Sequence, residues 1–166
     1  MSNTYAIHPG RRLLERLESV LTSSIMSIDA FAGVALRNDI SFTDTQLPFI
    51  SIEISSSEEK PLNSGIWHVG LSVVLAEDRE EAQIAIASAT GDARARHEAR
   101  LENLTARLSA TWDGSNLVTA INAVSNTQSL IANKTYGHAV THDASDEGKV
   151  YTQFTLTVIC ASSSQA

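Results

Sequence analysis

Apolar and polar residues alternate strictly in the stretch Ile66 to Ala76. Its odd positions are large and apolar, whereas the even positions include His68, Gly70 and Ser72, which are polar or small. A period of two residues over this length predicts a β-strand with one buried face. Burying each apolar side chain of that face is worth about 1.5–3 kcal/mol, so the face needs an apolar cover. The side chains concerned are Trp67, Val69, Leu71, Val73 and Leu75.

A second apolar pattern further along the chain has helical spacing. Its members recur every three or four residues and therefore share one stripe of a helix. They are His97, Leu101, Leu104, Leu108 and Trp112. We expect a helix from Ala93 to about Ala110, capped by Asp92, to cover the strand.

Charged residues border this stripe on both sides of the helix. Arg96, Arg100 and Arg107 lie on one side, and Glu98 and Glu102 on the other. We interpret them as a solvated border. The alternative is that they meet opposite charges on a neighbouring subunit, which makes the three arginines candidate interface residues.

The remaining periodic segments complete an α+β pattern. They are a helix at Arg11–Thr22, a strand at Phe49–Ser55, a short helix at Asn116–Ala123, and a closing hairpin formed by Tyr136–Asp143 and Lys149–Ala161. We predict one domain over residues 1–166: a mainly antiparallel sheet of about four strands with helices packed on one face. Residues 162–166 are predicted to be a frayed tail.

Two segments lack a period of their own. Residues 23–46 form an apolar arm carrying Phe31, Leu36 and Phe42. It either folds back on its own core, with Asp29 capping a helical turn, or packs on a neighbouring subunit. Residues 56–64 form the tip of an extended hairpin and place Glu58 and Glu59 in solvent.

Composition narrows the classes of function. The 166-residue chain has 43% hydrophobic residues and a net charge of −7, without a run of basic residues. Binding the phosphate backbone of DNA requires clustered positive charge, so the composition argues against a DNA-binding domain. No apolar run is long enough for a membrane span or a signal peptide, and the lone Cys160 cannot form an internal disulfide.

Few residues in the sequence are candidates for metal binding or catalysis. His138 and His142 would lie about 13 Å apart in a strand, too far for one metal ion. His97 is interpreted as a hydrogen-bonded core histidine, and Cys160 as a small buried hydrophobe. No nucleophile elbow, phosphate loop or dinucleotide turn occurs. We therefore expect no enzyme activity, no catalytic residue, no metal site and no cofactor.

The order of elements resembles a family of virion proteins. LPFISIEI follows the arm, IWHVGLSVVLAED runs into a helical region, and GKVYTQFTLTVIC closes the chain. In this ordered pattern the chain resembles the tail-terminator and tail-completion (neck) proteins of tailed bacteriophages.

The resemblance implies a structural protein that is made in the host cytoplasm and resides in the virion. Such subunits form a homo-oligomeric ring, commonly a hexamer, which caps the tail tube, ends its polymerisation and joins it to neck or connector proteins. DNA could pass the lumen without binding. The expected contact residues are Phe31, Leu36, Phe42, Glu58 and Glu59. A head–tail connector subunit and, from another class, a small soluble ligand-binding α+β module are the alternatives.

Overall fold

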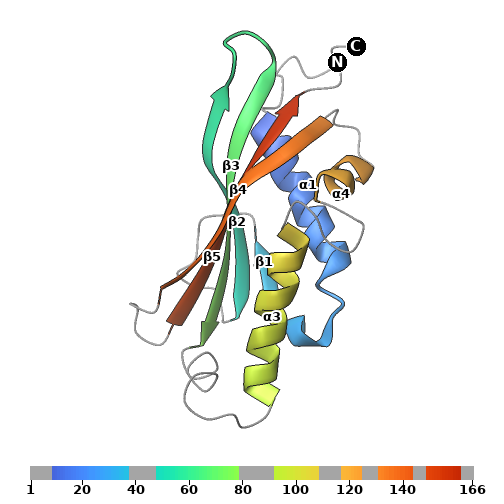
Figure 1. Ribbon diagram of the computed structural model, residues 1–166. Coiled ribbons are helices and arrows are strands. Elements are labelled where there is room, and N and C mark those ends of the chain that lie inside the picture. The colour runs from blue at the N-terminus through green and yellow to red at the C-terminus, as the bar shows by residue number, and fades with distance from the viewer. Residues whose placement is uncertain are drawn as a thin grey trace, which may run out of the picture.

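The computed structural model describes residues 9–37, 48–78, 92–108, 117–124, 131–143 and 149–161. In chain order their elements are α1 (Pro9–Ser24), η1 (Asp29–Phe31), β1 (Ala35–Arg37), β2 (Phe49–Glu59), β3 (Ile66–Asp78), α3 (Asp92–Leu108), α4 (Leu117–Ala123), β4 (Ile131–Asp143) and β5 (Lys149–Ala161). The expected α+β fold is confirmed. The helices lie together on one face of the sheet (Figure 1).

The sheet has five strands in the order β1-β2-β3-β5-β4. β2, β3, β5 and β4 pair antiparallel, as expected for the predicted hairpins, whereas β1 joins β2 in parallel. The sequence pattern did not predict β1, because three residues are too few to display a period. The central strand is β3, which is hydrogen-bonded on both sides for most of its length.

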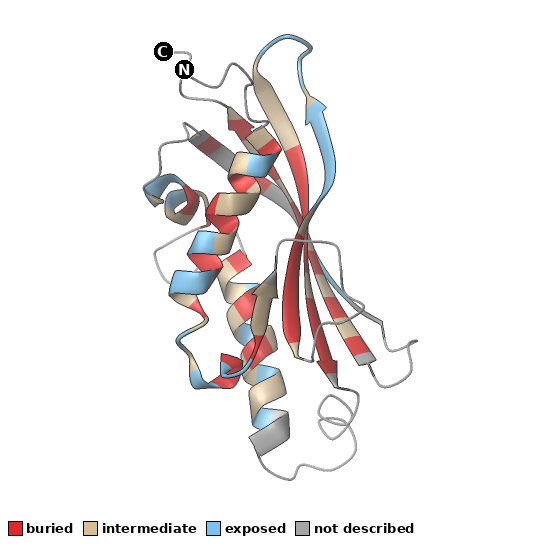
Figure 2. Cartoon of the chain, turned by 180° about the vertical axis from the view of Figure 1, so that it is seen from behind, coloured by how far each residue is buried: buried red, intermediate tan, exposed pale blue. Residues whose placement is uncertain are grey.

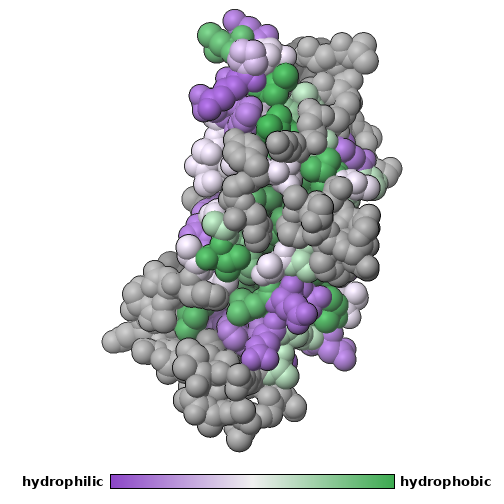
Figure 3. Space-filling view, viewed as in Figure 1, coloured by the Kyte–Doolittle hydropathy of each residue, from purple (hydrophilic) through white to green (hydrophobic). Residues whose placement is uncertain are grey.

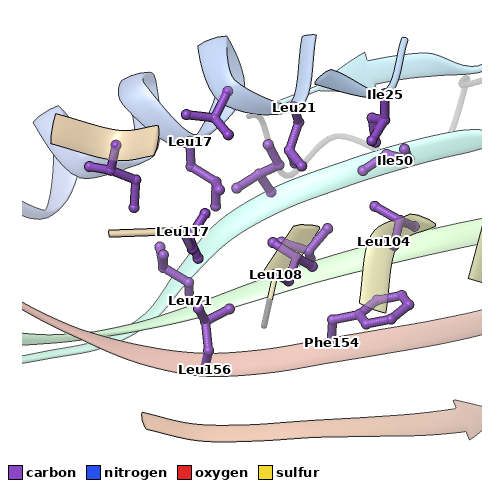
Figure 4. Close-up of a cluster of buried hydrophobic side chains, with 14 of the residues drawn as sticks. Leu17, Leu21, Ile25, Ile50, Leu71, Leu104, Leu108, Leu117, Phe154 and Leu156 are labelled. Carbon is purple, nitrogen blue, oxygen red and sulfur yellow. The ribbon is translucent and has the colours of Figure 1, made fainter. Parts of the chain in front are cut away.

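One apolar core fills the space between the sheet and the helices. Side chains from α1, α3 and α4 meet those of β2, β3 and β5 there (Figure 4). The labelled members are Leu17, Leu21, Ile25, Ile50, Leu71, Leu104, Leu108, Leu117, Phe154 and Leu156. The predicted apolar stripes of β3, α1 and α3 therefore face one another, with Leu104 and Leu108 buried and Leu101 partly buried.

Two strands are longer than the sequence pattern predicted. β2 continues through Ser56–Glu59, which the sequence predicted to be part of the hairpin tip, and β4 begins at Ile131 rather than Tyr136. Polar residues extend β2 because an antiparallel partner satisfies their backbone groups even where no side chain is buried. The hydropathy of neighbouring residues therefore does not predict pairing of this kind. The added part of β4 also buries Ala132 and Thr135.

The described part of the arm folds back on the core of its own subunit. α1 continues to Ser24, and η1 and β1 follow. Phe31 is 1% exposed and belongs to the core cluster, and Leu36 packs against it. The reading in which the arm covers its own core therefore holds for residues 23–37.

Several predictions fall outside the described residues. They are Phe42, Trp112 and the tail at residues 162–166.

Candidate functional site

The hairpin formed by β2 and β3 projects beyond the helices (Figure 1). Its β2 arm is exposed from Ile54 to Glu58, and the loop residue Leu62 is 81% exposed (Figure 2). Hydrophilic and hydrophobic side chains lie together at its end (Figure 3). The hairpin therefore combines a projecting shape with an exposed apolar side chain in its loop.

Hydrogen bonds from the backbone to Glu59 order the tip of this hairpin. The Glu59 carboxylate accepts the N–H groups of Asn63 at 2.7 Å and Gly65 at 3.1 Å. Asn63 and Gly65 both have positive φ, so the chain turns sharply there. The sequence predicted that Glu58 and Glu59 both face solvent. Glu58 does, beside Lys60 Nζ at 3.2 Å, whereas Glu59 bonds to the loop backbone.

A β-bulge lies where the hairpin leaves the body of the sheet. The register between β2 and β3 shifts between Ile54 and Ser56. Gly70 faces this irregularity, and a Cβ at that position would lie 2.8 Å from Ser55 Oγ and closer still to Ser56 Oγ. A side chain at this position would therefore displace the hydroxyls of the two exposed serines, whereas the backbone of Ser56 lies at ordinary contact distance.

A cluster of ionisable groups lies buried between β3, α3 and η1. Glu77 is fully buried, its Oε1 lies 2.7 Å from His97 Nδ1, and its Oε2 accepts a 3.1 Å hydrogen bond from Arg100 Nη1. Arg100 Nε also donates to the Ala30 carbonyl at 2.7 Å. Three elements that are distant in sequence are therefore joined by charge-assisted hydrogen bonds.

This cluster corrects the expected solvated border for Arg100. Its side chain is only 3% exposed, because position 100 lies between His97 and Leu104 on the buried stripe. The sequence contains one indication that a buried cation is needed here. Glu77 continues the odd positions of β3 onto the core face, where a carboxylate needs a partner. The interpretation of His97 as a hydrogen-bonded core histidine agrees with this geometry.

The structure separates the proposed interface residues into two groups. Phe31 and Arg100 lie inside their own subunit, so neither offers a surface to a neighbour in this fold. Glu58 is exposed, and Leu36, Glu59, Arg96 and Arg107 are partly buried. Their contact with another subunit stays a prediction.

The described residues give little basis for catalysis. No group of three or more potential metal ligands occurs among them. Burial raises the pKa of the Cys160 thiol from 9.0 to about 11, which leaves it protonated and weakly nucleophilic at neutral pH. A surface hollow beside α1 is lined by Glu15, Glu18, Ser19, Thr22 and Ser23, which form no convergent site. None of the described helices combines the length and apolar character needed to span a membrane.

Comparisons with known proteins leave the fold as the main guide to function. No protein-family profile and no curated protein sequence matches this chain.

Proposed function

We propose that this chain is a structural virion protein of a tailed bacteriophage. Six copies would form a ring that caps the tail tube, ends its polymerisation and joins it to the neck. The observation that carries this proposal is the β2–β3 hairpin, which projects from the α+β body with an ordered tip and an exposed Leu62. The proposal also draws on the order of elements along the sequence, in which the chain resembles the tail-terminator and tail-completion proteins.

The mechanism would be geometric. A head-to-tail ring uses two different patches on each subunit, and it closes when the rotation between neighbours completes a circle. One face of the ring would match the last ring of the tube, while the opposite face would not repeat that surface, so further addition stops. The sheet provides rigid positions, and the hairpin supplies the contact beyond them.

The charge of the chain suits a ring through which DNA passes. A net charge of −7 gives weak attraction for phosphates, so DNA could move through a lumen without being held. In this proposal the partners are other copies of the chain, the tail tube protein and the neck or connector proteins.

The first test is the mass of the purified protein by light scattering, followed by negative-stain imaging. Six subunits of 17.8 kDa would give about 107 kDa and ring-shaped particles. If the measured mass is that of a monomer, the protein is then mixed with purified tail tubes, because the ring can require the tube as a template to close. Added protein should appear at one end of each tube and block further growth.

Two other outcomes would redirect the proposal. Rings that bind portal or neck complexes but ignore tubes would favour the head–tail connector. A monomer that neither binds nor caps tubes would contradict a virion ring, and the small ligand-binding module would then be the leading account.

A further inference from the structure

We infer that the end of β4 at Ala139–Asp143 pairs edge to edge with β1 of a second copy of this chain. This inference rests on the proposed function, since a head-to-tail ring needs two different patches on each subunit, and the two outer strands of the sheet would supply them. It goes further by naming the contact, which would join the sheets of neighbouring subunits into one.

One end of the outer edge of β4 is already closed within the subunit. Asn122 of α4 donates from Nδ2 to the Ala132 carbonyl at 2.9 Å, and its Oδ1 accepts the Ala132 N–H at 2.8 Å. A single side chain thus takes both backbone groups of Ala132, as a neighbouring strand would. Register shifts between Ala132 and Lys134 and between Tyr136 and Ala139 then interrupt the strand.

Within the part of the chain that the structure describes, no side chain closes the other end of β4 in this way. Ala139, Val140 and Thr141 are all exposed, and Val140 is 38% exposed although it lies opposite the buried Phe154. These three residues include no charge and no proline, and no strand among the described residues pairs with their outer edge. Strand edges that stay in solvent are usually blunted by charges, prolines or bulges. This end therefore has the character of an edge that a partner covers.

The opposite edge of the sheet is β1, and it lies at the same height along the strands as the exposed end of β4. The register places Leu36 of β1, Ile50, Leu75, Thr152 and His142 of β4 in one row across the five strands.

The backbone of Leu36 is oriented for such a contact. The Ala35 N–H donates to the Pro48 carbonyl on the β2 side. Backbone groups of successive strand residues point to alternate sides, so those of Leu36 point outward. One outward residue can exchange a pair of hydrogen bonds with an antiparallel neighbour.

Strand direction makes the pairing antiparallel. β1 runs parallel to β2, and the three antiparallel steps to β4 leave β4 opposite in direction to β1. A second copy placed alongside with its helices on the same side would bring its β4 antiparallel to β1. A shift of two residues from that row would place the partner's Val140 directly opposite Leu36 on the helix-covered face, where Val140 would be shielded from water.

Cysteine cross-linking tests this contact in the full-length protein. The double variant Leu36→Cys/Val140→Cys should give a ladder of disulfide-linked multimers on mild oxidation, because facing strand residues have the Cα separation that disulfides need. The double variant Ala35→Cys/Thr141→Cys tests the same strand pairing on the opposite face of the sheet and should also give a ladder. Leu36→Cys/Thr141→Cys is the matched control, since its two side chains point to opposite faces, and its yield should be lower by on the order of tenfold.

The outcomes separate this inference from the proposed function. Particles that form rings or cap tubes, yet give no ladder with either matched pair, would overturn the edge pairing and leave the ring proposal intact. A ladder from protein that never caps tubes would support the edge pairing and contradict the capping function. Mixing the separately purified Leu36→Cys and Val140→Cys proteins should give covalent heterodimers only, which checks the result in less altered chains.

Discussion

Glu77 of β3 links the sheet to α3 and, through Arg100, to η1. Its carboxylate contacts His97 and Arg100 of α3, and Arg100 in turn reaches the carbonyl of Ala30 beside η1. Buried ion pairs contribute little net stability compared with apolar residues of equal size, but loss of one partner leaves a costly buried charge. The cluster therefore fixes how α3 sits on the sheet more than it adds stability.

Replacing Glu77 with glutamine should lower the free energy of unfolding by about 3–5 kcal/mol, because the negative charge beside the buried Arg100 is lost. Urea denaturation measures this change. Glu58→Gln is the matched control, since Glu58 is exposed, and its effect should stay within about 0.5 kcal/mol. The double variant Glu77→Gln/Arg100→Met should lose less stability than the sum of the two single variants. Simple additivity would contradict the coupling.

Cys160 should make stability depend on pH in the alkaline range. Burial raises its pKa to about 11 in the fold, against an ordinary value of 9.0, so the unfolded chain releases its proton first. The contribution of the thiol is complete below about pH 9 and is lost as the pH rises from there towards 11. Denaturation curves between about pH 8 and pH 10.5 should show a shallower decline for Cys160→Ala than for the native protein. Equal slopes would refute this assignment.

At the scale of elements, α4 and β4 are held together by the side chain of Asn122. Its amide makes two hydrogen bonds to Ala132, each worth about 0.5–1.5 kcal/mol net. Asn122→Ala should therefore destabilise the protein by about 1–3 kcal/mol in chemical denaturation. Ser19→Ala, on the exposed side of α1, serves as the control and should be nearly neutral. An effect no larger than that control would show that the Asn122 contact contributes nothing.

The hairpin is an element whose order depends on one carboxylate. Glu59→Ala should increase amide exchange at Asn63 and Gly65, because their N–H groups lose their acceptor. Global stability should change little, since the tip lies outside the core. Hydrogen exchange measured residue by residue checks this, with Glu58→Ala as the control. Unchanged exchange at both amides would mean that the loop is ordered without Glu59.

At the scale of the whole molecule, the proposed contact made by the hairpin can be tested without disturbing the fold. Leu62 is 81% exposed, so Leu62→Asp should leave the unfolding midpoint nearly unchanged. If the hairpin tip contacts the tail tube, the variant should bind tubes on the order of tenfold more weakly, as expected when an apolar contact is replaced by a charge. Co-sedimentation with tubes measures the binding, and Ser19→Asp controls for added charge. Equal binding would exclude Leu62 from the contact.

Much of the architecture followed from hydropathy alone. The alternation along β3 and β5 and the helical spacing in α1 each predicted an apolar face that is largely buried, whereas the pattern in α3 predicted Leu104 and Leu108 but not Arg100. Burial of an apolar face is a local demand that the chain expresses at a fixed period, so it can be read without knowing the partner. The same reasoning identified the hairpin as an extended element.

Other features came from contacts between distant segments. β1 is too short to show a period, and the polar end of β2 is a strand only because β3 pairs with it. Arg100 lies on the buried stripe of α3, and its charge is matched there by Glu77, which is 23 residues away in the sequence. Asn122 closes the edge of β4 through a contact that no local pattern encodes.

The sequence by itself determined most of the described strands and helices and most of the apolar side chains that they bury, because apolar burial depends on spacing along the chain. Only the tertiary structure decided which polar groups meet, which strand ends stay open and how far the hairpin reaches beyond the helices. Hydrogen bonds and ion pairs depend on distances of a few ångströms between residues far apart in sequence, and those distances exist only once the chain has folded.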